Sequence, residues 1–267
     1  MSFSPVDSKI CADLLQAVTD RIADIPERPS SDQDLSQLIA WTNEISHAAV
    51  AGLRPQLEAL YPDIGWLGEE DRPDTLASSY WLYDPVDGAY HYLQRLPLWA
   101  ASLVLVRDHR PVLSIVYDPT LHEVFMAELG RGATRNGAPI SVGTKADASA
   151  AVVGTAIPPL AQVGREEQEE ALALIGAVAR EVFVVRPMAA VSLQLAYVAA
   201  GRLDAYWENG RDAADWLAGA LLISESGGVV SDLRGRNFGW NGEGILAGNA
   251  PLHEALRKTV APLVAEK

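Results

Sequence analysis

Apolar residues at helical spacing dominate the first sixty positions of the chain. In the first stretch they recur at every fourth position: Val6, Ile10, Leu14, Val18 and Ile22. This spacing predicts an amphipathic helix with one buried stripe. Residues 24–31 contain two prolines and interrupt the pattern.

A second helix is predicted beyond that break, because Ser31 followed by Asp34 resembles a capping box. Its expected buried face carries these residues: Leu35, Leu38, Ile39, Thr42, Ile45, Leu53, Leu57 and Leu60. Packing against a core is enough to account for both stripes.

The middle of the chain has the composition of β-strands. A short strand over 64–68 is predicted to deliver three acidic residues, Glu69, Glu70 and Asp71. Further strands are expected at 80–83, 99–106, 112–117 and 122–127, and the short polar turn between the second and third favours antiparallel pairing. Asn136-Gly137 predicts a tight hairpin, since both residues tolerate positive φ.

The second half alternates between the two kinds of element. After a polar, small-residue bridge at 144–150, we expect strands at 152–156, 182–186 and 205–207, and helices at 166–179, 190–200 and 212–226, followed by a final helix through Leu252 and Leu263. The chain is therefore predicted to be a single domain, 1–267, in two lobes. The antiparallel-rich α+β lobe would span about 1–147, and the α/β lobe about 148–267.

Charge and cysteine content narrow the possible partners. The 267 residues carry a formal charge of −14, which argues against nucleic acid or an anionic membrane as the main partner. Cys11 is the single cysteine, so no disulfide framework is expected. The first residues do not resemble a secretory signal, and no apolar run reaches membrane-spanning length. We therefore expect a cytoplasmic protein.

One stretch, Trp81-Leu-Tyr-Asp84-Pro-Val-Asp87-Gly88-Ala89, organises the candidate chemistry. Pro85 fixes one φ angle between the two aspartates, and Gly88 permits a sharp turn out of the strand. Two carboxylates held together are unfavourable unless a cation lies between them. A short helix is expected to follow Gly88, and its first amides would face an anion.

Three acidic segments share this design: Gly68-Glu69-Glu70, Asp84 to Gly88, and Asp212-Ala-Ala-Asp215. Carboxylate oxygens favour Mg²⁺ or Mn²⁺, whereas the five scattered histidines form no zinc motif. The chain contains no nucleophile elbow and no glycine-rich nucleotide loop. Metal-assisted attack by water on a phosphate is the remaining hypothesis.

These motifs resemble the Mg²⁺-dependent inositol monophosphatase family of lithium-sensitive sugar phosphatases. Gly68-Glu69-Glu70 matches its Gly-Glu-Glu, and Trp81 to Gly88 matches its Trp-x-x-Asp-Pro-Ile-Asp-Gly. Gly132 to Gly137 fits its Gly-Ala-x-x-Asn-Gly hairpin, and Arg202 to Gly228 fits its C-terminal signature. The resemblance covers most of the chain.

The resemblance implies a layered αβαβα phosphatase fold, a homodimer and two or more Mg²⁺ ions. It places Glu69, Asp84 and the Val86 carbonyl on one ion, and Asp84, Asp87 and Asp215 on a second. It also implies that Asp87, the amides of Gly88 and Ala89, and Glu208 contact the substrate. Glu69 and Glu70 are the candidate catalytic proton acceptors.

Three departures from the family pattern accompany these matches. The family has Thr after Asp-Gly, where this chain has Ala89. The family's upstream Val-Thr-x-x-Asp segment is replaced by residues 41–46, which contain no aspartate. The tryptophan that normally precedes the C-terminal aspartate is displaced, since Ala214 precedes Asp215 and Trp216 follows it. A pair that orients the attacking water is therefore expected to be missing, which would slow turnover.

The sequence leaves three functions open. The leading hypothesis is a Mg²⁺-dependent phosphomonoesterase acting on a small sugar or cyclitol phosphate. The same chemistry could act on 3′-phosphoadenosine 5′-phosphate, fructose 1,6-bisphosphate or histidinol phosphate. The third is a catalytically weakened homologue that binds metal and phosphate. Asp212 is better explained as a helix cap than as a ligand, and Arg186 and Arg211 as salt-bridge partners than as phosphate clamps. His91, one turn beyond the amides of Gly88 and Ala89, is a candidate substrate contact.

Overall fold

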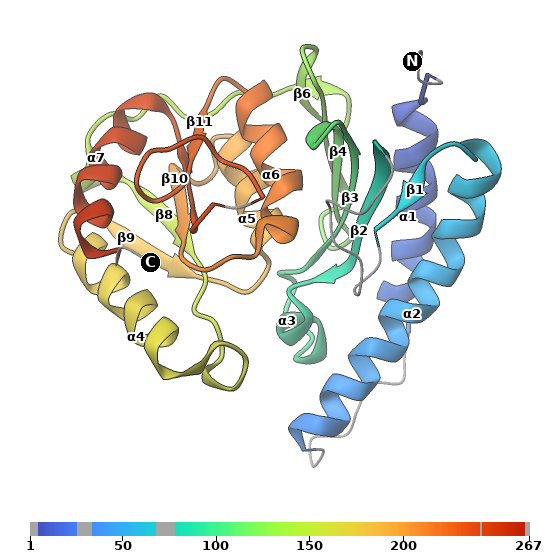
Figure 1. Ribbon diagram of the computed structural model, residues 1–267, viewed down its shortest axis with the longest axis horizontal. Helices are drawn as coiled ribbons and strands as arrows, with labels where there is room; N and C mark the ends of the chain where they lie inside the picture. Colours follow the sequence, from blue (N-terminus) through green and yellow to red (C-terminus); the bar gives the residue numbers. More distant parts are fainter. Residues whose placement is uncertain (1–4, 26–33, 68–77, 241, 265–267) are drawn as a thin grey trace.

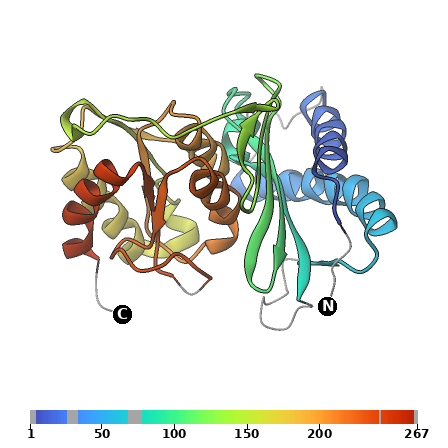
Figure 2. The same cartoon turned by 90° about the horizontal axis from the view of Figure 1, so that it is seen from above.

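The computed structural model describes residues 5–25, 34–67, 78–240 and 242–264. Figures 1 and 2 show five layers, in which two sheets alternate with three pairs of helices. Helices α1 (Ser8–Ala23) and α2 (Leu35–Leu60) cover the outer face of the first sheet. Helices α5 (Val191–Ala199) and α6 (Ala213–Glu225) lie between the sheets, and α4 (Leu160–Val178) and α7 (Ala250–Val260) cover the second sheet. The predicted αβαβα layering is confirmed.

The first sheet has seven strands in chain order. They are β1 (Gly65–Trp66), β2 (Ser79–Asp87), β3 (Ala100–Arg107), β4 (Arg110–Asp118), β5 (Glu123–Glu128), β6 (Gly132–Arg135) and β7 (Ala138–Pro139). Apart from the parallel pair β1–β2, neighbouring strands are antiparallel, as the sequence predicts. The hairpin at Asn136 and Gly137 has φ values of 50° and 78°, which confirms the predicted turn.

The second sheet has five strands in the order β11-β12-β10-β8-β9. They are β8 (Val152–Thr155), β9 (Val184–Pro187), β10 (Ala205–Glu208), β11 (Val229–Ser231) and β12 (Ile245–Gly248). Strand β8 is parallel to β9 and β10, whereas β12 is antiparallel to β10 and β11. Strands β11 and β12 were not among the predicted elements. The chain passes from one sheet to the other near the predicted bridge at 144–150, while the division into two lobes stays a prediction.

The buried residues of α1 and α2 differ in part from the predicted ones. Helix α1 buries Cys11, Leu15, Val18 and Ile22, whereas Ile10 is 41% exposed. In α2, Leu35 and Ile39 are 52% and 48% exposed, and the buried stripe consists of Ile45, Ala49, Leu53 and Leu57. At Leu35 and Ile39 the expected stripe was wrong because the first turns of α2 extend beyond the sheet (Figure 1). The predictions were also wrong for Ile10 in α1 and for Leu60 at the end of α2, which is 49% exposed.

The cap of α2 is also displaced from the predicted one. Asp34 is the N-cap, and it forms a reciprocal capping box with Gln37. The predicted partner Ser31 lies outside the described residues. Within the described part of the chain, no helix combines the length and apolar character that crossing a membrane requires.

A β-bulge in β2 determines where the two central aspartates lie. Asp84 pairs with Ser102 and Asp87 with Ala100, so three steps along β2 correspond to two along β3. In a regular strand, residues three apart point to opposite faces of the sheet. The extra residue at Pro85-Val86 cancels that alternation and brings both carboxylates to one side.

Gly88 connects the end of β2 to the short helix α3 (Ala89–Leu93). Its φ of +84° is a left-handed conformation that favours glycine. A Cβ atom here would lie 2.9 Å from the Cβ of Ala190 and 3.1 Å from the Leu98 carbonyl oxygen. The strand end and the start of α5 can approach this closely only because residue 88 has no side chain.

We expect Gly88→Ala to destabilise the protein more than Gly130→Ala. Both glycines have positive φ, but a Cβ at Gly130 would meet nothing within 4 Å. Gly130→Ala should cost about 1–2 kcal/mol of unfolding free energy from backbone strain alone. Gly88→Ala adds the contact with Ala190, and urea denaturation of the two variants measures the difference. Equal losses would show that the contact at Gly88 is relieved without cost.

Candidate active site

A cleft of about 510 Å³ lies where the two halves of the chain meet, and we call it the carboxylate cleft. The first half contributes the end of β2 and the start of α3. The second half contributes the segment before and at the start of α4, the start of α5 and the β10–α6 connection. Its walls include the predicted site residues Asp84, Val86, Asp87, Gly88, Ala89, Glu208 and Asp215. The structure therefore brings together every predicted site residue that it describes; Glu69 and Glu70 lie outside the described residues.

Asp84 and Asp87 differ in how they are held. The Oδ1 atom of Asp84 accepts one hydrogen bond, from the Val86 amide at 3.0 Å. Asp87 is buried and accepts hydrogen bonds from the first turn of α5, more than one hundred residues away in the chain. The Val191 amide donates to Oδ1 at 2.9 Å, and the amide and hydroxyl of Ser192 donate to Oδ2 at 2.7 and 2.5 Å. Asp87 therefore caps α5, a role that its sequence motif does not reveal.

Asp215 reaches the cleft from the first turn of α6. Its side chain is exposed, and it also borders a neighbouring cavity of about 700 Å³ that Asp84 and Ser46 line from the other side. Asp212 occupies the N-cap position of α6 as predicted, but its side chain makes no capping hydrogen bond with the described residues. Its carboxylate adds to the negative charge of the cleft.

Glu208 ends strand β10 and is fixed by two neutral donors. The Tyr206 hydroxyl and the Trp216 indole N–H each donate to its Oε2 at 2.7 Å. Trp216 is the residue whose displacement from the family pattern was noted above, and it is fully buried against this carboxylate. The displaced tryptophan thus has a definite partner, which the sequence alone did not identify.

The carboxylates raise one another's pKa values. Burial, then the charge of Asp87, raises the pKa of Asp84 to about 7. Burial, with added repulsion from Asp212 and Asp87, raises the pKa of Glu208 to about 7. The pKa of Asp215 is also raised, by the surrounding protein and then by Asp84, Asp212 and Asp87. The Asp215 side chain is exposed, so water screens these interactions.

The residues present fit a divalent cation between the carboxylates. Asp84 and Asp215 offer hard oxygen donors, and both line the same cleft. Within the described residues, no three His, Cys, Asp or Glu side chains form a complete metal-binding group. An ion held by Asp84 and Asp215 would therefore need further ligands, such as a backbone carbonyl, water or the undescribed Glu69.

The start of α3 forms one end of the carboxylate cleft. The first amides of a helix have no acceptor within the helix, and Gly88 and Ala89 border the cleft. Ala89 carries no hydroxyl, and residues 41–46 belong to the continuous helix α2. The side chain at position 46, which borders the neighbouring cavity, is a serine.

Of the remaining sequence candidates, His91 and Arg211 have local partners, whereas the exposed Arg186 forms no ion pair with the described residues, contrary to its prediction. His91 places Nδ1 2.6 Å from the Leu98 carbonyl oxygen, and it is not among the described residues that line the cleft. Arg211 lines the cleft but donates to Glu243 at 2.9 Å, which agrees with its prediction as a salt-bridge partner. Sequence reasoning missed Ser192 and the wall formed by Gln162 and Glu167. Neither has a recognisable motif.

Two solved structures from other organisms share this fold. An IMPase from Thermotoga maritima matches with a TM-score of 0.80 and 23% identity over 96% of both chains. The extragenic suppressor protein suhB from Bartonella henselae matches with a TM-score of 0.78 and 26% identity, covering 95% of this chain and 97% of that one. The chain therefore has the layered αβαβα fold of these two structures.

Residues 8–266 match the inositol monophosphatase family, and the chain belongs to that family. An inositol-1-monophosphatase of Rhizobium meliloti (strain 1021) is 36% identical over 222 residues, which are 82% of each protein. The Nus factor SuhB of Pseudomonas aeruginosa is 34% identical over 230 residues, 83% of each. The family resemblance is confirmed, and with it the assignment as a phosphoric monoester hydrolase. Members of the family are generally metal-dependent.

We expect Asp87→Asn to destabilise even the metal-free protein, whereas Asp84→Asn should not. An asparagine at 87 would point an amide N–H group at the donors of α5, and each unsatisfied buried group costs about 1–3 kcal/mol. An asparagine at 84 keeps an oxygen for the Val86 amide and removes a repelled charge. Urea denaturation in EDTA measures both. Equal stability of the two variants would contradict the capping role of Asp87.

We expect the stability of the metal-free protein to fall as pH rises from about 5 to 8. Glu208 has an ordinary pKa of 4.5, and the folded state raises it to about 7. The folded protein therefore binds the proton more tightly, so this contribution is lost as pH passes through the folded pKa. Thermal melting in EDTA measures the slope, and Glu208→Gln should reduce it. If Glu208→Gln left the pH dependence of stability unchanged, a residue other than Glu208 would be responsible for it.

Proposed function

We propose that the protein is a Mg²⁺-dependent phosphomonoesterase that hydrolyses a small sugar or cyclitol phosphate. One observation carries this proposal: Asp84 and Asp215, from opposite halves of the chain, meet in one cleft beside the helix start at Gly88 and Ala89. Membership of the inositol monophosphatase family supports the same reaction.

The proposed metal ligands are Glu69, Asp84, Asp87, Asp215 and the Val86 carbonyl. Bound divalent ions would neutralise the phosphate, lower the pKa of the attacking water and stabilise the departing oxygen. Asp87 has less capacity to bind a metal ion, because both of its carboxylate oxygens already accept hydrogen bonds from the start of α5. Asp84 and Asp215 have fewer protein partners, and they are the principal candidates.

The chain's own groups supply binding and orientation. The amides of Gly88 and Ala89 would donate to a phosphate oxygen at the start of α3. The second oxygen of Glu208 would accept a hydrogen bond from a substrate hydroxyl group, because Tyr206 and Trp216 fix Oε2. Glu69 and Glu70 remain the proposed proton acceptors for the attacking water.

A polyol monophosphate fits the cleft better than a bisphosphate. Glu208 offers an acceptor to a hydroxyl group, while Glu167 and Asp212 also face the same space. Arg211 is already paired with Glu243, which weakens it as a clamp for a second phosphate. The charge balance thus favours a sugar or cyclitol phosphate over fructose 1,6-bisphosphate or 3′-phosphoadenosine 5′-phosphate. Histidinol phosphate remains an alternative with one phosphate.

A second candidate function is a weakened homologue that binds metal and phosphate with little turnover. Ala89 lacks the hydroxyl of the family pattern, and Asp87 is engaged by α5. Relatives that carry the name Nus factor SuhB are about as similar to this chain as those named inositol-1-monophosphatase. The expectations of a homodimer, a cytoplasmic location and no nucleic-acid partner stay predictions.

We expect phosphate release from myo-inositol 1-phosphate to require Mg²⁺ and to disappear in EDTA. Asp215→Asn should lower kcat/KM by about 100-fold or more. Loss of a residue that only supports a metal ligand costs up to about 100-fold, and Asp215 is proposed to bind the metal directly. Asp212→Asn is the matched control, since it lies one turn earlier in the same cleft without a proposed ligand role.

Phosphate release is measured with myo-inositol 1-phosphate, fructose 1,6-bisphosphate and histidinol phosphate. Calorimetry measures Mg²⁺ binding. Mg²⁺ binding without turnover on any substrate would favour the weakened homologue over the enzyme. Equal activity of Asp215→Asn and Asp212→Asn would reject the assignment of Asp215.

A further inference from the structure

Helix α5 begins at the carboxylate cleft but does not cap itself. Its N-cap residue, Ala190, has no side chain that can accept a hydrogen bond. The amides of Val191 and Ser192 donate instead to Asp87, on the neighbouring sheet. The position of α5 and the orientation of the Asp87 carboxylate are therefore coupled.

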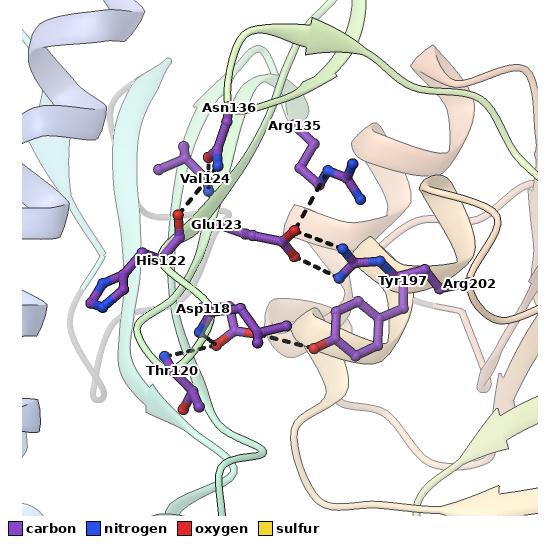
Figure 3. Close-up of polar contacts among 10 residues, drawn as sticks. Asp118, Thr120, His122, Glu123, Val124, Arg135, Asn136, Tyr197 and Arg202 are labelled. Atoms are coloured by element: carbon purple, nitrogen blue, oxygen red, sulfur yellow. Dashed lines mark hydrogen bonds and ion pairs between the residues drawn. The ribbon is translucent and has the colours of Figure 1, made fainter.

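The other end of α5 is held by the same sheet, at the turn between β4 and β5 (Figure 3). The Tyr197 hydroxyl donates to Oδ2 of Asp118 at 2.9 Å. Asp118 is completely buried, and its Oδ1 accepts from the amides of Thr120 and Leu121 at 2.9 and 3.1 Å. These bonds fix the acceptor, so the tyrosine hydroxyl has a defined target.

A second contact lies beside the first (Figure 3). Arg202, just beyond α5, donates to both carboxylate oxygens of Glu123, at 2.5 and 2.6 Å. Its guanidinium carbon lies 5.2 Å from the centre of the Tyr197 ring and 5.9 Å from that of Phe125. A bidentate pair of this kind restricts direction as well as distance.

We propose that Tyr197 and Arg202 are positioning residues of the active site. By fixing the C-terminal end of α5 to the β4–β5 turn, they hold the Val191 and Ser192 amides where those amides orient Asp87. The proposal rests on the proposed function, because it assigns Asp87 a part in metal or substrate binding.

The geometry favours positioning over simple stabilisation. Neither Tyr197 nor Arg202 is among the described residues that line the carboxylate cleft, so each acts on it only through α5. From Val191 to Tyr197 the helix rises about 9 Å, at 1.5 Å per residue, and a helix of this length moves as a rigid body. Partly buried ion pairs such as Arg202–Glu123 add little net stability, but they specify geometry.

Tyr197→Phe tests the proposal, because it removes the bond to Asp118 and keeps the ring. In the metal-free protein, hydrogen exchange of the amides at 191–193 should become faster, while exchange in α7 stays unchanged. Mg²⁺ affinity should fall roughly three- to tenfold, and kcat/KM about tenfold, given that a 1 Å misplacement can cost about 10²-fold.

Tyr117→Phe is the matched control. Tyr117 precedes Asp118 in β4, and its hydroxyl donates to Asp20 of α1 at 2.7 Å, on the opposite face of the sheet. Asp118→Asn should retain function, since an asparagine can accept from the two turn amides and donate to the tyrosine oxygen.

Faster exchange at 191–193 in Tyr197→Phe alone would support the proposal. Equal exchange and equal Mg²⁺ affinity in Tyr197→Phe and Tyr117→Phe would overturn it. The exchange measurement needs neither metal nor substrate. An inactive wild-type protein would therefore count against the proposed function while leaving this readout intact.

Discussion

The bonds between the Asp87 carboxylate and the first amides of α5 connect the two halves of the molecule at the site itself. One partner ends a strand of the seven-stranded sheet, and the other starts a helix that packs against the five-stranded sheet. Gly88 permits the close approach, since any side chain there would meet Ala190. The shape of the cleft therefore depends on a contact between segments about one hundred residues apart.

The same contact explains how several carboxylates can share a small volume. Asp87 is compensated by helix amides and the Ser192 hydroxyl, and Glu208 by a phenol and an indole. Asp84 and Asp215 have less compensation, and their mutual repulsion stores unfavourable energy in the metal-free protein. Binding of a cation would release that energy. Asp87 and Glu208 are thus tied to the fold by their hydrogen-bond donors, whereas Asp84 and Asp215 remain available to a ligand.

Much of the fold was predictable because periodicity reports burial directly. The strands of the first sheet, the hairpin at Asn136 and most helices follow from local pattern, and the motif around Asp84 lies in the cleft. The strands β11 and β12 were missed because they follow one another without a helix between them, which departs from the alternation of strands and helices in the second half. The bond from Ser192 to Asp87 was missed for a different reason: it depends on tertiary approach, which no local spacing encodes.

The β-bulge at Pro85-Val86 has a consequence for how this region can change in evolution. The bulge and the three-residue spacing of the aspartates depend on each other. With the present spacing, a strand that paired regularly would turn Asp87 towards the opposite face of the sheet, and α5 would lose its cap. A deletion of one residue would remove the bulge and leave the aspartates two positions apart, still on one face. The number of residues between the aspartates can therefore change only together with the bulge.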